Sequence, residues 1–385
     1  MSEPILPGAT LGVLGGGQLG RMFVHAAQAM GYGTAVLDPD AASPAGLVAH
    51  HHVQTPYLDR QGLASLVQCS AAITTEFENV PAGALAAIGV QRPVAPSADA
   101  VSICQHRVAE KAQFARSGVP CAPYAAIDGA RSLAGVDASL LPGLLKTSTL
   151  GYDGKGQQRV ATRSELEAAW NALERVPCVL EQLLPLQCEL SVIVARNAQG
   201  ECVHFPAQRN LHRSGVLAVT EVPARGIGDT LQQQAIGAAE RIAHDMQYVG
   251  VLCVEFFVLE DGSLIANEMA PRPHNSGHYT IDACDVSQFE LQVRTLTGLP
   301  LTAPRLHSPA VMLNLLGDLW QRDGAEAAPA WNEVLALPGA HLHLYGKPSV
   351  RRGRKMGHLT VTAASAERAR ATALVAAARL GIEAF

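Results

Sequence analysis

The feature that most restricts the possible folds of this chain is a glycine-rich turn between an apolar strand and a helix near its N-terminus. The strand is expected over residues 10–14, the turn reads Gly15-Gly16-Gly17-Gln18-Leu19-Gly20, and a second strand over 34–37 ends at Asp38. This G-x-G-x-x-G pattern followed by an acid matches the dinucleotide fingerprint of a Rossmann-like βαβ unit. The same helix N-terminus can hold another phosphorylated ligand, or the glycines can serve packing alone. The pattern therefore predicts a parallel α/β domain and leaves three interpretations of the turn open.

The composition indicates a folded chain of two or three domains. The 385 residues are 48% hydrophobic and 16% charged, which supports a sizeable core. A formal net charge of -5 argues against a general nucleic-acid binder, because such proteins are usually basic. The eight cysteines form no C-x-x-C pair, and the sequence shows neither a charged leader nor an apolar run of about 18 residues. We therefore expect a cytoplasmic protein with reduced thiols and no membrane or nucleic-acid partner.

A candidate ligand contact follows the apolar strand expected over residues 71–75. Glu76 comes directly after this strand, where open α/β sheets bind ligands; a solvated acid at a helix start is the alternative. A further strand is expected over 92–96, and Ser97 is expected to cap a helix over 98–117.

A second glycine-rich loop follows an apolar run that carries one lysine. Lys146 lies in the run 144–150, and the loop 151–157 then holds three glycines and Lys155. Glycines let backbone N–H groups approach a bound anion, and lysine adds a mobile positive charge, which suits a polyphosphate. The loop lacks the Gly-Lys-Ser/Thr of a Walker P-loop, and an ordinary hairpin turn is the alternative.

A pair of acids on one hairpin predicts a metal site. The strands expected over 251–259 and 263–269 are joined by Asp261-Gly262, a dipeptide typical of two-residue hairpin turns. Such a turn would place Glu255 directly opposite Glu268, with both side chains on one face. Facing carboxylates among apolar neighbours repel unless a cation lies between them, and Mg²⁺ prefers carboxylates with phosphate oxygens. A solvated pair of acids is the alternative.

Two further strands, expected over 178–184 and 189–194, carry acids at their edges. A strand edge can pair with adenine, and a carboxylate can accept hydrogen bonds from ribose. Taken singly, each acid fits an ordinary surface group better than a ligand contact.

The segment 270–278, beyond the hairpin, contains groups suited to anion and proton chemistry. Arg272 suits an oxyanion and His274 can transfer a proton; a structural turn is the alternative. A smaller unit is expected after residue 300, with a basic cluster at 351–358 that fits a phosphate site or a solvated turn better than nucleic acid. The histidines at 50–52 are expected on alternating strand faces, which argues against one shared metal ion.

Read in order, these motifs resemble the ATP-grasp enzymes, and among them the 5-(carboxyamino)imidazole ribonucleotide synthases of purine biosynthesis. The matching stretches run through nearly the whole chain: Gly15 to Met22, Glu76 to Val80, Lys146, Gly151 to Gln157, Glu181-Gln182, Asn267 to His278 and Gly353 to His358.

The resemblance implies a mixed α/β and α+β fold with three domains: a Rossmann-like domain over 1–118, an ATP-grasp domain over 119–302 and a small C-terminal domain over 303–385. It implies a ligase that converts ATP and bicarbonate to ADP and carboxyphosphate and then carboxylates the amine of 5-aminoimidazole ribonucleotide, releasing phosphate. It also implies Mg²⁺ as cofactor, with Mn²⁺ as an alternative, and a homodimer.

The resemblance also implies residue roles. ATP contacts would come from Arg107, Lys146, Gly151, Tyr152, Asp153, Gly154, Lys155, Gly156, Gln157, Glu181, Gln182, Leu183, Leu184, Glu189, His212, Asn267 and Glu268. Ribonucleotide contacts would come from Gln18, Leu19, Glu76, Tyr152, Asp153, Lys347, Arg354 and Lys355. Glu255 and Glu268 would bind the metal, and Lys155, Arg272, His274 and Asn275 would be catalytic.

One position departs from the ATP-grasp pattern, because Ala270 stands where many of these enzymes have a third metal ligand, Asn. Asn267 or water is the expected substitute. The rival functions are another ATP-grasp ligase such as a formate-using transformylase, an NAD-binding protein, and a nucleotide sensor without turnover.

Overall fold

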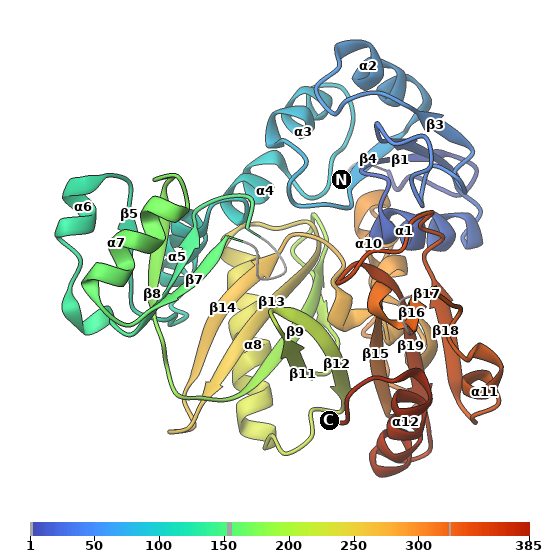
Figure 1. Ribbon diagram of the computed structural model, residues 1–385. Coiled ribbons are helices and arrows are strands. Elements are labelled where there is room, and N and C mark those ends of the chain that lie inside the picture. Colours follow the sequence, from blue (N-terminus) through green and yellow to red (C-terminus); the bar gives the residue numbers. More distant parts are fainter. Residues whose placement is uncertain (1–2, 152–155, 323–324) are drawn as a thin grey trace.

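The structure is a computed structural model that describes residues 3–151, 156–322 and 325–385 (Figure 1). Its N-terminal part is a parallel sheet in the order β3-β2-β1-β4. Leu11 and Val13 on one face of β1 share a core with α1, and Leu14 on the other face shares one with α2 and α3. The strands are β1 (Thr10–Leu14), β2 (Gly33–Leu37), β3 (His51–Val53) and β4 (Ala72–Thr75), and the helices are α1 (Gln18–Ala29), α2 (Arg60–Cys69), α3 (Ala82–Gly89) and α4 (Ala98–Cys104).

Two expectations for this part are wrong in detail. The strand predicted over 92–96 is reduced to one isolated bridge between Val94 and Ile73. The helix predicted over 98–117 is two helices, α4 and α5 (Arg107–Arg116), although Ser97 caps the first as expected, accepting from Ala100 N at 3.2 Å. The helix breaks because the backbone N–H of Arg107 donates to Ser148 O at 2.9 Å instead of to a helical carbonyl.

The next part is an antiparallel sheet in the order β5-β8-β6-β7. Its strands are β5 (Tyr124–Ile127), β6 (Gly143–Thr147), β7 (Gln157–Val160) and β8 (Cys178–Gln182), with the helices α6 (Ala130–Ala134) and α7 (Arg163–Ala172). Figure 1 shows it as the green lobe beside the larger central sheet.

The central sheet has nine strands, in the order β14-β13-β9-β11-β12-β15-β19-β18, with β10 paired to β9. The predicted C-terminal unit continues this sheet, because β15 pairs with β12. The strands are β9 (Leu186–Arg196), β10 (Cys202–His204), β11 (Gln208–Arg213), β12 (Val216–Val222), β13 (Gly250–Leu259), β14 (Leu264–Ala270), β15 (Ala310–Leu316), β18 (Ala340–Leu344) and β19 (Lys355–Thr362); β16 (Gln321–Arg322) and β17 (Ala325–Glu326) pair separately.

Helices cover both faces of the central sheet and join it to the N-terminal part. Apolar residues of α8 form one core with β9 and β13, and α10 contributes Leu291 to the core on the opposite face. The other side of α10 packs Phe289 and Val293 against Leu19 and Phe23 of α1. The helices are α8 (Asp229–Asp245), α9 (Thr280–Ala283), α10 (Gln288–Thr297), α11 (Trp331–Leu335) and α12 (Ala366–Leu380). Among the described residues, no helix is both long and apolar enough to cross a membrane.

The β13–β14 hairpin pairs Glu255 directly with Glu268, as predicted, but by a different route. The turn spans 260–262 rather than two residues, because the backbone N–H of Leu259 donates to Ser263 O and so closes the hairpin at these two residues. Within the turn, Gly262 adopts a φ of +82°. This turn alone would place Glu255 opposite Asn267. A β-bulge next to Glu255 shifts the register by one residue and so brings the two acids together.

Candidate active site

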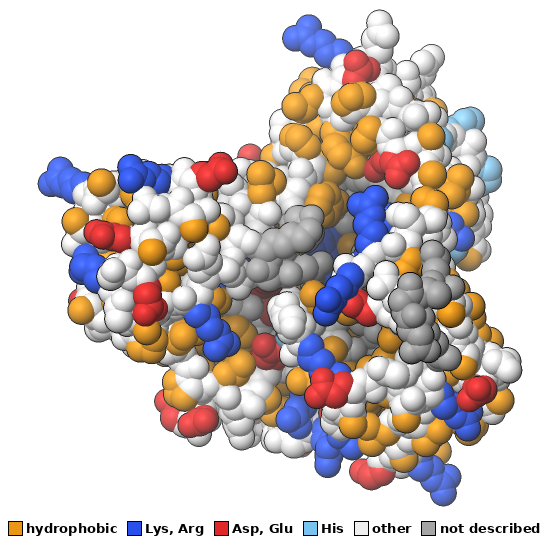
Figure 2. Space-filling model, in the orientation of Figure 1, with side chains coloured by type: hydrophobic (Ala, Val, Ile, Leu, Met, Phe, Trp, Pro, Cys, Tyr) orange, Lys and Arg blue, Asp and Glu red, His pale blue; other side chains and the backbone are white. Residues whose placement is uncertain are grey.

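A cleft of about 260 Å³ lies where the N-terminal, middle and C-terminal parts of the chain meet. Figure 2 shows Lys and Arg side chains along one side of the hollow beside the N-terminal part. The charged and imidazole groups that line the cleft are Glu78, Glu110, Glu189, Glu255, Glu268, Arg107, Lys146, Arg272, Lys355, His212 and His274. This mixture suits a polyanion bound together with a cation.

The carboxylates of Glu255 and Glu268 face the cleft beside Asn267. Burial raises the pKa of Glu255; His212 opposes the rise, and the Glu268 carboxylate adds to it. Asn267 Oδ1 is buried and has no hydrogen-bond partner among the described residues. Two carboxylates and an unpartnered amide oxygen are the donor types that Mg²⁺ prefers, and Asn267 fits the role that Ala270 cannot fill.

Lys146 reaches the cleft from β6, and Glu181 on the neighbouring β8 holds it there. Lys146 Nζ lies 2.8 Å from one oxygen of the buried Glu181 carboxylate, and Lys111 Nζ lies 3.0 Å from the other. Burial alone would raise the pKa of Glu181, but the two lysines lower it to about 2. The sequence reasoning missed the role of Lys111, although its position one helical turn after Arg107 was a usable signal.

Arg107 lines the cleft and contacts both Glu268 and the start of the second glycine-rich loop. Its Nη1 contacts Glu268 Oε2 at 3.4 Å and its Nη2 donates to Gly151 O at 3.2 Å. Glu110, one turn further along α5, was also missed; its Oε1 accepts from the Met269 N–H at 2.6 Å. Burial raises the pKa of Glu110 to about 8, Glu268 adds to the rise and Arg107 opposes it.

Arg272 forms a half-buried ion pair with Glu78 that sequence reasoning did not foresee. Burial alone would lower the pKa of Arg272, but Glu78 raises it, so the guanidinium stays charged. His274 lies between Ser276 and Glu255: its Nδ1 is 2.9 Å from Ser276 Oγ and its Nε2 is 3.4 Å from Glu255 Oε1. Burial lowers the pKa of His274 well below its ordinary value, and Arg272 adds to this, so the ring is neutral.

The remaining predicted nucleotide contacts lie partly in the cleft. Glu189 and His212 line it and form an ion pair with each other. Burial alone would lower the pKa of His212, but the carboxylates of Glu189, Glu255 and Glu268 raise it to about 9. The residues 181–184 do not line the cleft. Gln182 Nε2 donates to Ser139 O and the backbone N–H of Leu183 donates to Pro142 O, both at 3.0 Å. Leu184 packs on an apolar cluster. Asn275 is buried but does not line the cleft.

The loop predicted to hold phosphates enters the cleft at both of its described ends. Gly151 and Gln157 line the cleft, and Gly156 accepts a hydrogen bond from Thr147 N at 3.0 Å. Tyr152, Asp153, Gly154 and Lys155 lie outside the described residues.

In the N-terminal turn, two carboxylates of the chain accept hydrogen bonds from three glycine N–H groups. Glu76 accepts from Gly17 N at 2.9 Å and from Gly20 N at 3.0 Å, and Asp38 accepts from Gly16 N at 2.7 Å. Asp38 is thus engaged within the domain, which removes the ribose contact that an NAD site requires. Of the substrate candidates here, Leu19 has a buried side chain, so only its backbone can face a ligand.

The basic cluster contributes one side chain to the cleft, Lys355. Arg354 Nη1 donates to Ser349 O at 2.8 Å, and Lys347 Nζ donates to Lys355 O at 2.6 Å. The structure therefore brings Lys355 to the other site residues, and holds Lys347 and Arg354 in the adjoining loop.

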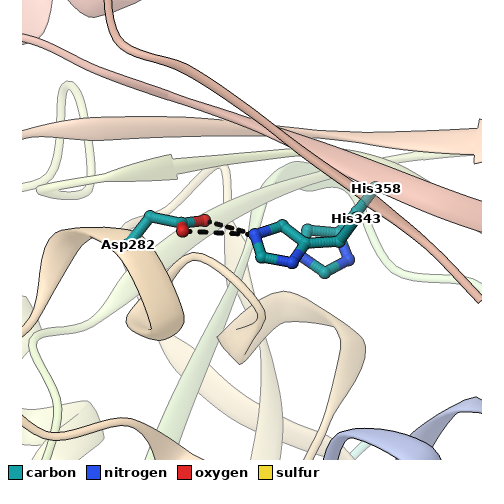
Figure 3. A group of neighbouring side chains, drawn as sticks. All are labelled: Asp282, His343 and His358. Atoms are coloured by element: carbon teal, nitrogen blue, oxygen red, sulfur yellow. Dashed lines mark hydrogen bonds and ion pairs between the residues drawn. The ribbon is translucent and has the colours of Figure 1, made fainter.

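Several histidines outside the cleft form hydrogen bonds and packing contacts within the chain. His50 and His52 hydrogen-bond separately, to Thr34 and to the Asp38 carbonyl. Asp282, His343 and His358 are the one group in the described ranges with metal-ligand atoms within 4.8 Å of one another (Figure 3). Both Asp282 oxygens bond to His343 Nε2, and the two rings stack 4.5 Å apart with 13° between their planes. In-plane lone pairs of stacked rings do not converge on one ion, so we interpret this group as packing.

Comparisons with known proteins show which families the three parts of the chain around the cleft resemble. Three family models match consecutive parts of the chain: a ribonucleotide synthetase preATP-grasp domain over residues 8–105, an ATP-grasp domain over 112–289, and a phosphoribosylaminoimidazole carboxylase C-terminal domain over 310–372. The N5-carboxyaminoimidazole ribonucleotide synthase of Brucella melitensis is 44% identical over 357 residues, which is 92% of this chain and 96% of that protein. That of Bacillus subtilis is 41% identical over 362 residues, 94% and 93% of the two chains.

The chain belongs to the N5-carboxyaminoimidazole ribonucleotide synthase family. Solved structures agree: an N5-carboxyaminoimidazole ribonucleotide synthetase in complex with ADP matches with a TM-score of 0.90 and 39% identity over 98% of both chains. The Aspergillus clavatus enzyme in complex with ADP and 5-aminoimidazole ribonucleotide matches with a TM-score of 0.88 and 32% identity, over 97% of this chain and 98% of that one.

Membership of this synthase family decides the function. The protein is an ATP-grasp ligase, and its reaction is the ATP-dependent carboxylation of 5-aminoimidazole ribonucleotide in purine biosynthesis. The fold prediction is confirmed, with a preATP-grasp domain, an ATP-grasp domain and a C-terminal domain in that order.

Proposed function

We propose that the cleft binds ATP, bicarbonate and 5-aminoimidazole ribonucleotide together and runs the reaction through carboxyphosphate. The observation that carries this proposal is that Glu255, Glu268 and Asn267 line one cleft together with Lys146 and Arg107. Oxygen donors and cationic groups in one cleft fit a metal-bound triphosphate.

The cationic side chains would neutralise the phosphates. Phosphoryl transfer needs positioning and charge neutralisation more than covalent help, so Lys146 and Arg107 on the cleft wall, with Lys155 from the loop, suit the β- and γ-phosphates. Glu181 fixes Lys146 by an ion pair at 2.8 Å, which reduces the freedom that this lysine would lose on binding. The other nucleotide contacts assigned from the resemblance stay part of the proposal.

We propose Mg²⁺, with Mn²⁺ as an alternative, at Glu255 and Glu268 with Asn267 Oδ1 as a further ligand. The bound ion would neutralise charge that develops on the transferred phosphoryl group. The two carboxylates would hold the ion in place, because the bulge next to Glu255 brings Glu255 and Glu268 opposite each other on the hairpin.

The acceptor side of the cleft would hold the ribonucleotide and the carboxyl group. Arg272, held by Glu78, suits the negative charge of bicarbonate and carboxyphosphate, beside His274 and Asn275. Lys355, with Lys347 and Arg354 from the same loop, suits the phosphate of the ribonucleotide, together with the backbone at Gln18 and Leu19. Each Glu76 oxygen accepts one glycine N–H, which leaves lone pairs for donors of the imidazole.

The wider proposal is a cytoplasmic homodimer with domains over 1–118, 119–302 and 303–385. The family resemblance suggests the dimer, and α5 ends at Arg116, just before the first boundary.

The experiment that tests the proposal is ADP release with ATP, Mg²⁺ and bicarbonate, measured with and without 5-aminoimidazole ribonucleotide. We expect a large stimulation by the ribonucleotide that is lost in Glu268→Ala. Replacing bicarbonate with formate should abolish the stimulation, because a formate-using ligase would keep it. ATP turnover that ignores the ribonucleotide would refute the assigned acceptor.

A further inference from the structure

We propose that Ser191 and Ser276 are positioning residues that hold the proton of His274 on Nδ1 and leave Nε2 as a hydrogen-bond acceptor facing the cleft. The role of His274 in the reaction rests on the proposed function, but the hydrogen-bond chain that fixes its tautomer does not. The chain runs beneath the cleft, from β11 through β9 to the 3₁₀ turn at Asn275–Gly277.

The chain starts at Gln208, whose amide has a fixed orientation. Gln208 Nε2 donates to Pro206 O at 2.5 Å and to the Tyr279 hydroxyl at 3.1 Å. Turning the amide over would bring its oxygen against the Pro206 carbonyl with no proton between them, and proline carbonyls only accept. Gln208 Oε1 therefore faces Ser191, at 2.9 Å.

Ser191 has one hydroxyl proton, and it donates that proton in a hydrogen bond to Gln208 Oε1. Among the described residues, Ser191 is the donor that reaches Gln208 Oε1. The other two partners of Ser191 Oγ must then donate to it: Asn210 Nδ2 does so at 2.8 Å, and the Ser276 hydroxyl lies at 2.8 Å. Two lone pairs accept two donors, so the Ser276 proton points to Ser191.

With its own proton committed, Ser276 Oγ can only accept from His274. The Oγ to Nδ1 distance is 2.9 Å, so Nδ1 carries the ring proton. One contact favours the opposite tautomer, since the backbone N–H of Ser276 points at Nδ1 from 3.3 Å. That contact is longer, and satisfying it would leave one of two shorter contacts without a proton: Ser276 Oγ to Nδ1 at 2.9 Å, or Ser276 Oγ to Ser191 Oγ at 2.8 Å.

The consequence is an acceptor at the cleft. In the neutral ring Nε2 carries a lone pair, and it lies 3.4 Å from Glu255 Oε1, which is also an acceptor. Two facing acceptors favour a cation or a donor group between them. Nε2 therefore suits a ligand group that brings N–H or O–H, such as the exocyclic amine of the ribonucleotide or the hydroxyl of bicarbonate, and does not suit a bare phosphate oxygen.

The test is ¹⁵N NMR of histidine-labelled full-length protein without substrates, with His274→Gln to assign the resonances. We expect Nδ1 protonated and Nε2 bare in the wild type. Ser191→Ala leaves every group around His274 in place but frees the Ser276 proton, which should turn to Nδ1 and move the ring proton to Nε2. Thr295→Val is the matched control, because it removes a buried hydroxyl on α10 whose proton goes to Gln292 O and which takes no part in this chain.

A wild-type ring protonated on Nε2, or a tautomer that Ser191→Ala leaves unchanged, would overturn the proposal. Circular dichroism checks that each variant is folded. If the ring switches as expected, Ser191→Ala should also lower kcat roughly tenfold while KM for ATP stays constant; a switch without this loss would count against the role of His274 in catalysis and leave the tautomer assignment standing.

Discussion

The Glu78 carboxylate forms an ion pair with the Arg272 guanidinium, although the two residues are 194 positions apart in the chain. Glu78 follows β4 of the N-terminal sheet, and Arg272 follows the β13–β14 hairpin. The pair therefore links the domain proposed to hold the ribonucleotide to the groups proposed to hold carboxyphosphate.

Glu78→Gln should lower kcat/KM for bicarbonate about tenfold. The amide keeps the size of the side chain and one acceptor but loses the charge-assisted bond that orients Arg272, a loss of about 1.5 kcal/mol. Steady-state kinetics with each substrate varied in turn measure the effect. Glu290→Gln, which breaks the surface pair between Glu290 and Arg294, is the matched control and should change no constant more than about twofold. Equal behaviour of the two variants would contradict the orienting role.

Glu181→Gln should destabilise the fold by about 3 kcal/mol at pH 7, because it leaves Lys111 and Lys146 buried without a counter-charge. The effect should depend on pH. The Glu181 pKa is lowered in the folded state to about 2, so its contribution is present above its ordinary value near 4.5 and is lost as the pH falls toward 2.

Urea unfolding of wild type and variant from pH 7 to pH 3 tests this prediction, and the difference in unfolding free energy should shrink over the acidic part of that range. Glu167→Gln removes an exposed acid on α7 and should change stability by less than about 0.5 kcal/mol at every pH. A difference that stays constant with pH would argue against the paired state of Glu181.

Asn267→Ala should raise the Mg²⁺ concentration for half-maximal activity roughly tenfold, if its unpartnered Oδ1 is a metal ligand. Activity should recover at high Mg²⁺, since both carboxylates remain. Titration of ADP release with Mg²⁺ and then with Mn²⁺ measures the shift. Asn171→Ala, which removes an exposed amide bonded to Arg175, should leave the titration unchanged. An unaltered metal requirement in Asn267→Ala would leave water as the third ligand.

The motifs predicted from sequence are those in which the residue type itself carries the chemistry. Glycines after a strand, an acid at a strand end and a lysine in an apolar run each follow from local pattern, and the comparisons confirm the domains that they indicated. The sequence did not predict that Glu76 bonds within its own domain, because an acid after a strand has the same local pattern whether it contacts a ligand or accepts from the N–H groups of Gly17 and Gly20.

What the sequence could not supply are the partners brought together by tertiary packing. Lys111, Glu110 and Glu78 sit on elements whose neighbours lie far along the chain, and burial of a charged residue has no local signature. The helix break before Arg107 depends on a hydrogen bond to Ser148, which no pattern near residue 105 encodes. The pairing of Glu255 with Glu268 was predicted correctly from an incorrect turn, since the longer turn and the bulge cancel each other.

Gly262→Ala should separate the stability of this hairpin from its function. Gly262 has a φ of +82°, and a Cβ there meets no atom within 4 Å, so the expected cost is backbone strain alone, about 1 kcal/mol. The turn is exposed and remote in register from Glu255, so kcat and the Mg²⁺ requirement should not change. Urea unfolding and the Mg²⁺ titration measure the two quantities.

Gly83→Ala is the matched control, because a Cβ at Gly83 also meets no neighbour within 4 Å. Gly83 lies in α3 at a φ outside the left-handed region, so alanine favours the helix there and should not destabilise it. A Gly262→Ala variant with a raised Mg²⁺ requirement would mean that turn and bulge are coupled, and that the register at the metal pair depends on the turn.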